Sequence, residues 1–189
     1  MGDAPTDTPT NAPATTVMDG EAIARAVRRI SHEILERNDE PHDLLLVGLV
    51  TRGAHLADRM ADHASDLSGT RVSSIHLDVT GYRDDVDRQM HPAAGAEADI
   101  DVTGRAVVIV DDVMYTGRTA RAALDAITAR GRPAATQLAV LVDRGHREMP
   151  LRPDYVGKNL PTSHEERVAV RLTEVDGEDA VCLEQWRAR

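Results

Sequence analysis

The sequence predicts an α/β fold, with a mostly parallel β-sheet flanked by helices. Three segments, at residues 44–50, 107–110 and 136–142, are largely apolar and show no polar alternation. Such runs are typical of strands that are buried on both faces. Each of the first two runs is followed by a short loop and then by a segment of helix-forming composition. Strand, loop and helix in this order are typical of an open α/β sheet.

Local patterns predict the other elements. Residues 1–18 are rich in Pro, Thr, Ala and Asp, so we expect a disordered tail there and a single domain over residues 19–189. Asp19 has the chemistry and the position of an N-cap for the first helix. In chain order we expect a helix at 20–37, a strand at 44–50, a helix at 54–63, a strand at 72–79, a long loop to about 103, a strand at 104–110, a helix at 120–129, a strand at 136–142, an irregular segment at 154–162, and a hairpin of strands 167–172 and 179–183. A loop as long as the one before residue 104 is typical of a flexible lid.

Composition narrows the function classes. The 189 residues carry a net charge of −10, and the pI is near 5.2, so we expect no overall attraction to nucleic acid or anionic lipid. Any polyanion would have to meet a local basic surface. The single cysteine, Cys182, excludes a disulfide framework and fits a reducing compartment. Because no apolar run approaches membrane-spanning length, we expect a cytoplasmic protein without a membrane partner.

The segment 107–119 carries the clearest chemical signal. A buried strand ends in two adjacent acids, Asp111 and Asp112, and a small hydroxyl-rich turn then leads into a helix. A helix N-terminus after such a turn binds anions, because its backbone N–H groups and dipole point at the loop. The triphosphate-loop pattern GxxxxGK[ST] is absent. Acids beside a phosphate cradle suit a ligand with sugar hydroxyls next to its phosphate; the alternative is an Asp that caps the helix, with no ligand.

A second loop has similar chemistry. Thr51, Arg52 and Gly53 follow the strand at 44–50, so a cation and a tight turn lie where a parallel strand ends. An arginine with exposed backbone amides suits a diphosphate. Because ligands of open α/β sheets lie at the carboxyl ends of the strands, we expect this loop and the acidic loop to share one crevice.

The segment 107–119 resembles the phosphoribosyl pyrophosphate (PRPP) motif of the type I phosphoribosyltransferases. The resemblance implies that Asp111 and Asp112 hold the ribose hydroxyls, and that Arg83 on the lid completes the catalytic set. It implies that Thr51, Arg52 and Gly53 meet the diphosphate. The turn that would hold the 5′-phosphate and the nucleotide comprises Val113, Met114, Tyr115, Thr116, Gly117, Arg118 and Thr119.

Several segments together are similar to the bacterial regulators of pyrimidine operons within that family. This subgroup is implied to transfer phosphoribosyl from PRPP to uracil, giving UMP, and to bind pyrimidine mRNA leaders. The resemblance further implies Mg²⁺ carried in by PRPP with no protein metal site, and a homodimer or higher oligomer. It also implies a small C-terminal hood that covers the base through backbone groups, with Tyr155, Val156 and Lys158 as the base-binding residues. An ordinary capping loop is the alternative for that stretch. The matching segments are 29–34, 51–53, 82–85, 111–119, 142–148 and 154–159.

Basic residues are the candidates for RNA contact. Four of them fall on the face of the first helix opposite its apolar stripe; Arg144 and the others follow the strand at 136–142, and all of them together could form a local positive surface. The alternative is a solvated face of salt bridges. Two other functions stay open: transfer to another base without RNA binding, and nucleotide sensing without turnover. The RNA candidates are Arg25, Arg28, Arg29, His32, His146, Arg147, Arg152 and Lys158.

Overall fold

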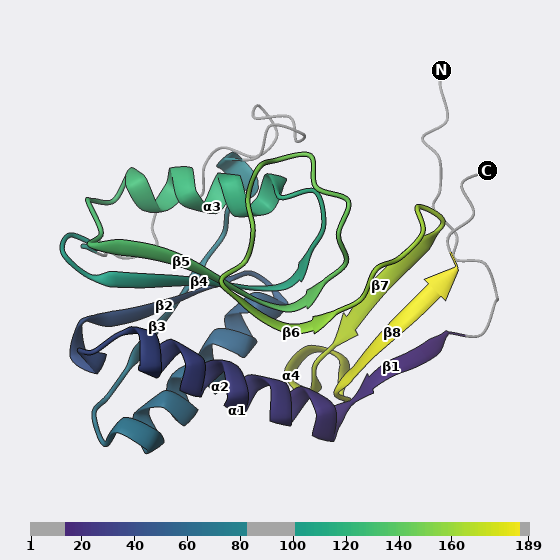
Figure 1. Ribbon diagram of the computed structural model, residues 1–189, viewed down its shortest axis with the longest axis horizontal. Helices are drawn as coiled ribbons and strands as arrows, with labels where there is room; N and C mark the ends of the chain where they lie inside the picture. Colours follow the sequence, from purple (N-terminus) through teal and green to yellow (C-terminus); the bar gives the residue numbers. More distant parts are fainter. Residues whose placement is uncertain (1–13, 83–100, 186–189) are drawn as a thin grey trace.

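The computed structural model describes residues 14–82 and 101–185 of the chain (Figure 1). Two short 3₁₀ helices, Pro41–Asp43 and Thr80–Tyr82, connect larger elements. Arg83 and most of the expected lid lie outside the described residues. The other elements in chain order are β1 Thr15–Asp19, α1 Gly20–Arg37, β2 Leu44–Leu49, α2 Arg52–Ser68, β3 Ser73–Leu77, β4 Ala106–Met114, α3 Arg118–Thr128, β5 Ala135–Asp143, β6 Tyr155–Asn159, β7 Glu166–Arg171, α4 Thr173–Asp176 and β8 Ala180–Gln185.

A five-stranded parallel sheet in the order β3-β2-β4-β5-β6 forms the centre of the fold. Helices α1 and α2 cover one face and α3 covers the other (Figure 1). Because both faces are covered, β2, β4 and β5 are almost continuously apolar, as the sequence predicted. The α/β class is confirmed, and the carboxyl ends of all five strands meet at one edge of the sheet.

Two glycines let α2 approach the sheet very closely. A Cβ atom on Gly48 would lie 2.5 Å from the Cα atom of Ala54, and one on Gly53 would lie 2.5 Å from the carbonyl oxygen of Val110. Real Cβ atoms essentially never come so close to backbone, so these positions require glycine. The contact presses the start of α2 against β4 just before Asp111, which brings the two predicted loops together.

A second, antiparallel sheet in the order β1-β8-β7 stands beside the first (Figure 1). It packs on the α1 and α2 side of the core through Val168, Val170 and Leu172. We call this sheet together with α4 the hood; residues 155–159, which the resemblance placed in a hood, instead form β6 of the main sheet. The two strands β7 and β8 were predicted, but the turn between them contains the short helix α4 before Gly177.

The prediction of a disordered tail to residue 18 is wrong at its C-terminal end. Residues from Thr15 form β1, which pairs with β8 so that Thr16 faces Cys182 and Asp19 faces Ala180. This pairing spans most of the chain, so local composition could not reveal it. Asp19 caps α1 as predicted, because its Oδ1 accepts the Ala22 N–H at 2.8 Å.

Other elements also differ from the prediction, among them β4, which continues to Met114 rather than ending at residue 110. Helix α2 runs from Arg52 to Ser68, several residues beyond the expected 54–63, and ends at Gly69 with a left-handed φ of 67°. The segment at 155–159, expected to be irregular, is strand β6, because it pairs in parallel with β5 along the edge of the sheet. Within the described residues, none of the helices has the length and apolar character needed to cross a bilayer.

Candidate active site

The two adjacent acids lie within β4, close to its end. Asp111 and Asp112 are half-buried, and the strand continues past them to Met114, where it still pairs with Asp143 of β5. Each carboxylate accepts the backbone N–H of the next residue: Asp111 Oδ1 from Asp112 at 2.9 Å, and Asp112 Oδ1 from Val113 at 2.8 Å. These bonds fix both side chains at the carboxyl edge of the sheet.

The turn after the acids forms the floor of a cavity. Gly117 has a left-handed φ of 91° and immediately precedes α3, whose first amides have no partner within the helix. A cavity of about 120 Å³ is lined by Asp111, Thr116, Gly117 and Thr119 together with neighbouring apolar side chains. Asp111 and the turn before α3 therefore open into the same space, as the sequence predicted; that this turn binds an anion stays a prediction.

The loop after β5 donates hydrogen bonds to the carbonyl groups of this turn. The Thr116 carbonyl accepts the N–H groups of Glu148 and Met149 at 2.9 and 3.0 Å, and Arg147 donates to the Tyr115 carbonyl at 2.8 Å. In a trans peptide the N–H points opposite to the preceding carbonyl. The amides of Thr116 and Gly117 are consequently directed away from the loop after β5, which is the orientation that an anion needs.

Arg147 therefore has a role that the sequence did not suggest. Arg147 was predicted to contact RNA, but its side chain is largely enclosed. Besides the Tyr115 carbonyl, it donates to Asp143 Oδ2 at 2.6 Å and to the Leu151 carbonyl at 3.1 Å. Arg118 of the turn is also paired, with Glu148 at 2.8 Å. Partners up to 32 residues away cannot be seen in a local charge pattern.

A buried cation stacks on the tyrosine of the turn. The Arg144 guanidinium lies 3.9 Å from the centre of the Tyr115 ring, and it donates to Thr162 Oγ1 at 3.0 Å and to the Glu166 carbonyl at 2.8 Å. The His146 ring packs edge-on against the same Tyr115 ring, with centroids 5.8 Å apart. His146, predicted to contact RNA, is thus part of the wall beside the turn.

Arg52 lies at the crevice, but its partner is an acid of the hood. Its Nε and Nη2 atoms donate to the two carboxylate oxygens of Asp176, at 3.1 and 2.7 Å. The hydrogen bonds with Asp176 raise the pKa of Arg52, and the nearby charge of Asp112 raises it further. The same bonds lower the pKa of Asp176. Arg52 therefore lies between Asp112 of β4 and Asp176 of the hood.

A neighbouring arginine of α2 joins the hood more extensively. Arg59 makes four hydrogen bonds of 2.6 to 2.8 Å, two to Glu174 and two to Asp179. These bonds lower the pKa of Asp179 to about 2 and raise that of Arg59. Sequence analysis missed this cluster, because nothing local connects α2 with acids more than a hundred residues later.

The predicted base-binding residues are only partly near the crevice. Tyr155 is 4% exposed, and its hydroxyl donates to Gln137 Oε1 at 2.8 Å inside the core, so its side chain is excluded from a ligand. The parallel pairing of β6 turns this side chain toward α1. Val156 is half-buried against the α3 side, and Lys158 is exposed. A role for their backbone groups stays a prediction.

The predicted RNA-binding residues fall into separate groups. Arg25, Arg29 and Lys158 line a groove of about 290 Å³ between β1, α1 and β6, while Arg28 and His32 are exposed on α1. Arg29 also donates to the carbonyls of Val156 and Gly157, both at 2.9 Å, and pairs with Glu33 at 2.6 Å. Arg25 has only a loose pair with Glu21 at 3.3 Å.

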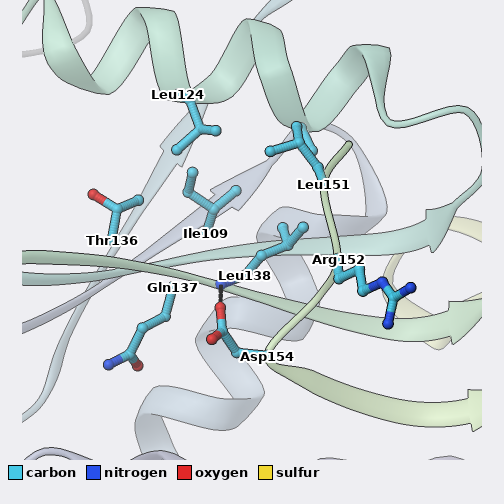
Figure 2. Close-up of a pocket in the computed structure, with 9 residues that line it drawn as sticks. Ile109, Leu124, Thr136, Gln137, Leu138, Leu151, Arg152 and Asp154 are labelled. Atoms are coloured by element: carbon cyan, nitrogen blue, oxygen red, sulfur yellow. Dashed lines mark hydrogen bonds between the residues drawn. The ribbon is translucent and has the colours of Figure 1, made fainter. Parts of the chain in front are cut away.

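Arg152 is separated from that groove. Figure 2 shows it with Asp154 beside a pocket of about 110 Å³, which α3, β4 and β5 line with Ile109, Leu124 and Leu138. Asp154 Oδ2 accepts the Leu138 N–H at 2.9 Å. The predicted basic residues thus do not make one continuous surface.

Comparison with known proteins agrees with this geometry. Residues 13–174 match the family model "Phosphoribosyl transferase domain". Two relatives named "Bifunctional protein PyrR" are each 53% identical: that of Clostridioides difficile over 171 residues, covering 89% of this chain and 97% of the relative, and that of Chloroflexus aurantiacus over 169 residues, covering 88% and 93%.

A solved structure shares the fold at low sequence identity. The hypoxanthine phosphoribosyltransferase of Trypanosoma cruzi superposes with a TM-score of 0.68 at 18% identity, covering 92% of this chain and 97% of that one. This likeness concerns the arrangement of strands and helices, and the close relatives decide the subgroup. The chain therefore belongs to the phosphoribosyl transferase family and, within it, to the bifunctional PyrR proteins.

Proposed function

We propose that this protein transfers the phosphoribosyl group of PRPP to uracil, giving UMP and diphosphate, and that it also binds pyrimidine mRNA leaders as a nucleotide-responsive regulator. The observation that carries the enzymatic part is the cavity in which Asp111 meets the turn at Thr116–Thr119. A sugar with a terminal phosphate is the ligand that such an arrangement suits.

The chemistry requires positioning and charge rather than covalent catalysis. Breaking the bond between ribose and diphosphate creates cationic character on the sugar, so nearby carboxylates favour the transition state. Asp111 and Asp112 would bind the ribose hydroxyls and supply that charge. The amides of Thr116 and Gly117 would hold the 5′-phosphate, and Arg52 would neutralise the leaving diphosphate. We assign Arg83, from the predicted lid, to the same diphosphate when the lid closes.

Mg²⁺ accompanies the substrate in this proposal. Phosphoribosyltransferases generally use Mg²⁺ with PRPP, and the carboxylate oxygens at the crevice are the donor type that this ion prefers. Among the described residues, three clustered acidic or histidine side chains occur at Glu40, His42 and Asp43, which are exposed and lie outside the crevice. We therefore assign the ion to the substrate's oxygens, where it would neutralise diphosphate charge.

The direct test of the enzymatic proposal is uracil-dependent release of diphosphate from PRPP. Uracil, orotate and hypoxanthine are compared in the same assay at equal concentration. We expect turnover with uracil and little with the other two bases. Turnover with another base would favour the alternative transferase, and PRPP binding without product would favour a nucleotide sensor.

The groove beside β1 supports the RNA part of the proposal. Arg25, Arg29 and Lys158 place three cations around one hollow, and the adjacent Arg28 and His32 extend them along α1. These groups give a local positive surface on a chain whose net charge is −10. We also propose self-association into dimers or higher oligomers, which sedimentation equilibrium would measure.

We predict that Arg25→Gln weakens binding of a pyrimidine leader RNA by about three-fold to ten-fold and lowers the slope of log affinity against log salt by about 1. Arg121→Gln is the matched control, because Arg121 is an exposed arginine of α3 far from the groove and should leave both quantities unchanged. Gel shifts at several salt concentrations, with and without UMP, provide the measurement. Equal effects of the two substitutions would argue against this groove.

A further inference from the structure

The fork between Arg52 and Asp176 connects the diphosphate loop to the hood. Arg52 is the middle residue of the Thr51–Gly53 loop and the first residue of α2, and Asp176 is the last residue of α4. The two donors and two acceptors form parallel hydrogen bonds of 3.1 and 2.7 Å between residues 124 positions apart. A guanidinium binds phosphate oxygens through the same paired geometry.

A second attachment holds the hood independently of this fork. Arg59 lies seven residues after Arg52, on the same face of α2, and binds Glu174 and Asp179 with four hydrogen bonds. Its side chain is 23% exposed, against 31% for Arg52. The hood would therefore stay on α2 if the fork at Arg52 were opened.

The segment around Asp176 has its own local restraints. Besides the fork, Asp176 Oδ2 accepts the Leu172 N–H at 2.9 Å, and the Asp176 N–H donates to the Leu172 carbonyl at 2.7 Å. Gly177 follows with a left-handed φ of 77°, and its N–H donates to the Thr173 carbonyl at 3.2 Å. Hydrogen exchange at the Asp176 and Gly177 amides therefore reports on whether this segment keeps its hydrogen bonds.

We propose that Asp176 is an internal competitor of diphosphate for the Arg52 guanidinium. This inference rests on the proposed function, because it takes the Thr51–Gly53 loop as the diphosphate site. The Nε and Nη2 groups of Arg52 cannot donate the same hydrogen bonds to the Asp176 carboxylate and to a diphosphate at once. The negative charge of Asp176 also repels the anion. Binding of diphosphate then exchanges the partner of Arg52 and loosens the 172–177 segment, while Arg59 keeps the hood attached.

The test measures binding of inorganic diphosphate to the full-length protein by calorimetry. Asp176→Asn keeps the shape and one acceptor but removes the charge, so we expect about three-fold to ten-fold tighter binding. Glu178→Gln is the matched control: it removes one hood charge two residues away, from an exposed pair with Arg171, and should change affinity less than two-fold.

Hydrogen exchange gives a second readout on the same proteins. Diphosphate should speed exchange at the amides of Asp176 and Gly177 in the wild type, and have little effect on them in Asp176→Asn. Wild-type binding with no gain in Asp176→Asn would overturn the inference alone. No diphosphate binding by the wild type would overturn the proposed site and this inference together.

Discussion

Arg144 is only 9% exposed, and its guanidinium stacks on Tyr115, which lines the cavity at the turn before α3. Its partners are the Thr162 hydroxyl, the Ser163 and Glu166 carbonyls, and the face of the Tyr115 ring. A buried cation is costly unless it is well hydrogen-bonded. The Arg144 side chain donates hydrogen bonds to Thr162 and Glu166, at the start of β7. At the same time it stacks on Tyr115 in the turn before α3.

We predict that Arg144→Leu lowers the free energy of unfolding by about 2–4 kcal/mol, because it leaves the buried Thr162 hydroxyl and two partly buried carbonyl groups without this donor and removes the stacked cation. Urea denaturation monitored by circular dichroism is the measurement. Arg121→Leu, at an exposed position of α3, should stay within about 0.5 kcal/mol of the wild type. Equal effects at both positions would show that Arg144 has no special structural role.

Single residues also show where sequence analysis succeeds. Asp111, Thr116 and Gly117 were predicted correctly as lining one cavity, because their order on a strand, a turn and a helix start fixes their relation locally. The contacts of the Arg147 and Tyr155 side chains were not predicted. Their partners, the Tyr115 carbonyl and Gln137, come close only through the pairing of strands β4, β5 and β6.

Among the elements, α2 contacts both β4, just before the two acids, and the hood. Gly53 presses its first turn against β4, and Arg59 joins its middle to Glu174 and Asp179. The relation of the hood to the main sheet therefore depends on ion pairs as well as on the apolar contacts of Val168 and Val170.

This attachment gives a pH-dependent contribution to stability. The hydrogen bonds from Arg59 lower the folded-state pKa of Asp179 from 3.8 to about 2. The folded protein thus binds fewer protons at Asp179 than the unfolded chain, so the contribution is complete above about pH 4 and is lost as the pH falls toward 2. Loss of this ion pair should loosen the hood before it affects the main sheet.

We predict that Asp179→Asn reduces the free energy of unfolding by about 1–2 kcal/mol at pH 7, and that the difference from the wild type shrinks between about pH 4 and pH 2. Urea titrations across that range measure it. Glu178→Gln, in an exposed pair with Arg171, should have an effect below about 0.5 kcal/mol at every pH. A difference that persists undiminished at pH 2 would contradict the assignment.

Elements were predictable where their pattern is local. Strands β2, β4 and β5 and helix α1 were found from apolar runs and helical spacing. Strands β1 and β6 were missed, because their composition is mixed and each depends on one distant partner: β8 for β1, and β5 for β6. Long-range pairing, rather than propensity, decides such edge strands.

Across the whole molecule, the segments assigned to the proposed ligand site lie at the carboxyl edge of one parallel sheet. The loop after β2, the acids of β4 and the turn before α3 meet there because all five strands run in the same direction. The hood reaches the same edge through Asp176, and the basic groove lies apart, beside β1 and α1. Ligand chemistry and RNA contact are therefore assigned to different surfaces of one fold.

The most direct measurement is the affinity for PRPP of a protein in which Asp111→Asn and Asp112→Asn are combined. Charge-assisted hydrogen bonds contribute about 1.5–3 kcal/mol each, so we predict that the double variant shows no measurable binding, while Asp112→Asn alone loses about ten-fold to a hundred-fold. Asp125→Asn, an exposed acid of α3, should bind PRPP like the wild type. Near-normal affinity of the double variant would contradict the assignment of the sugar site.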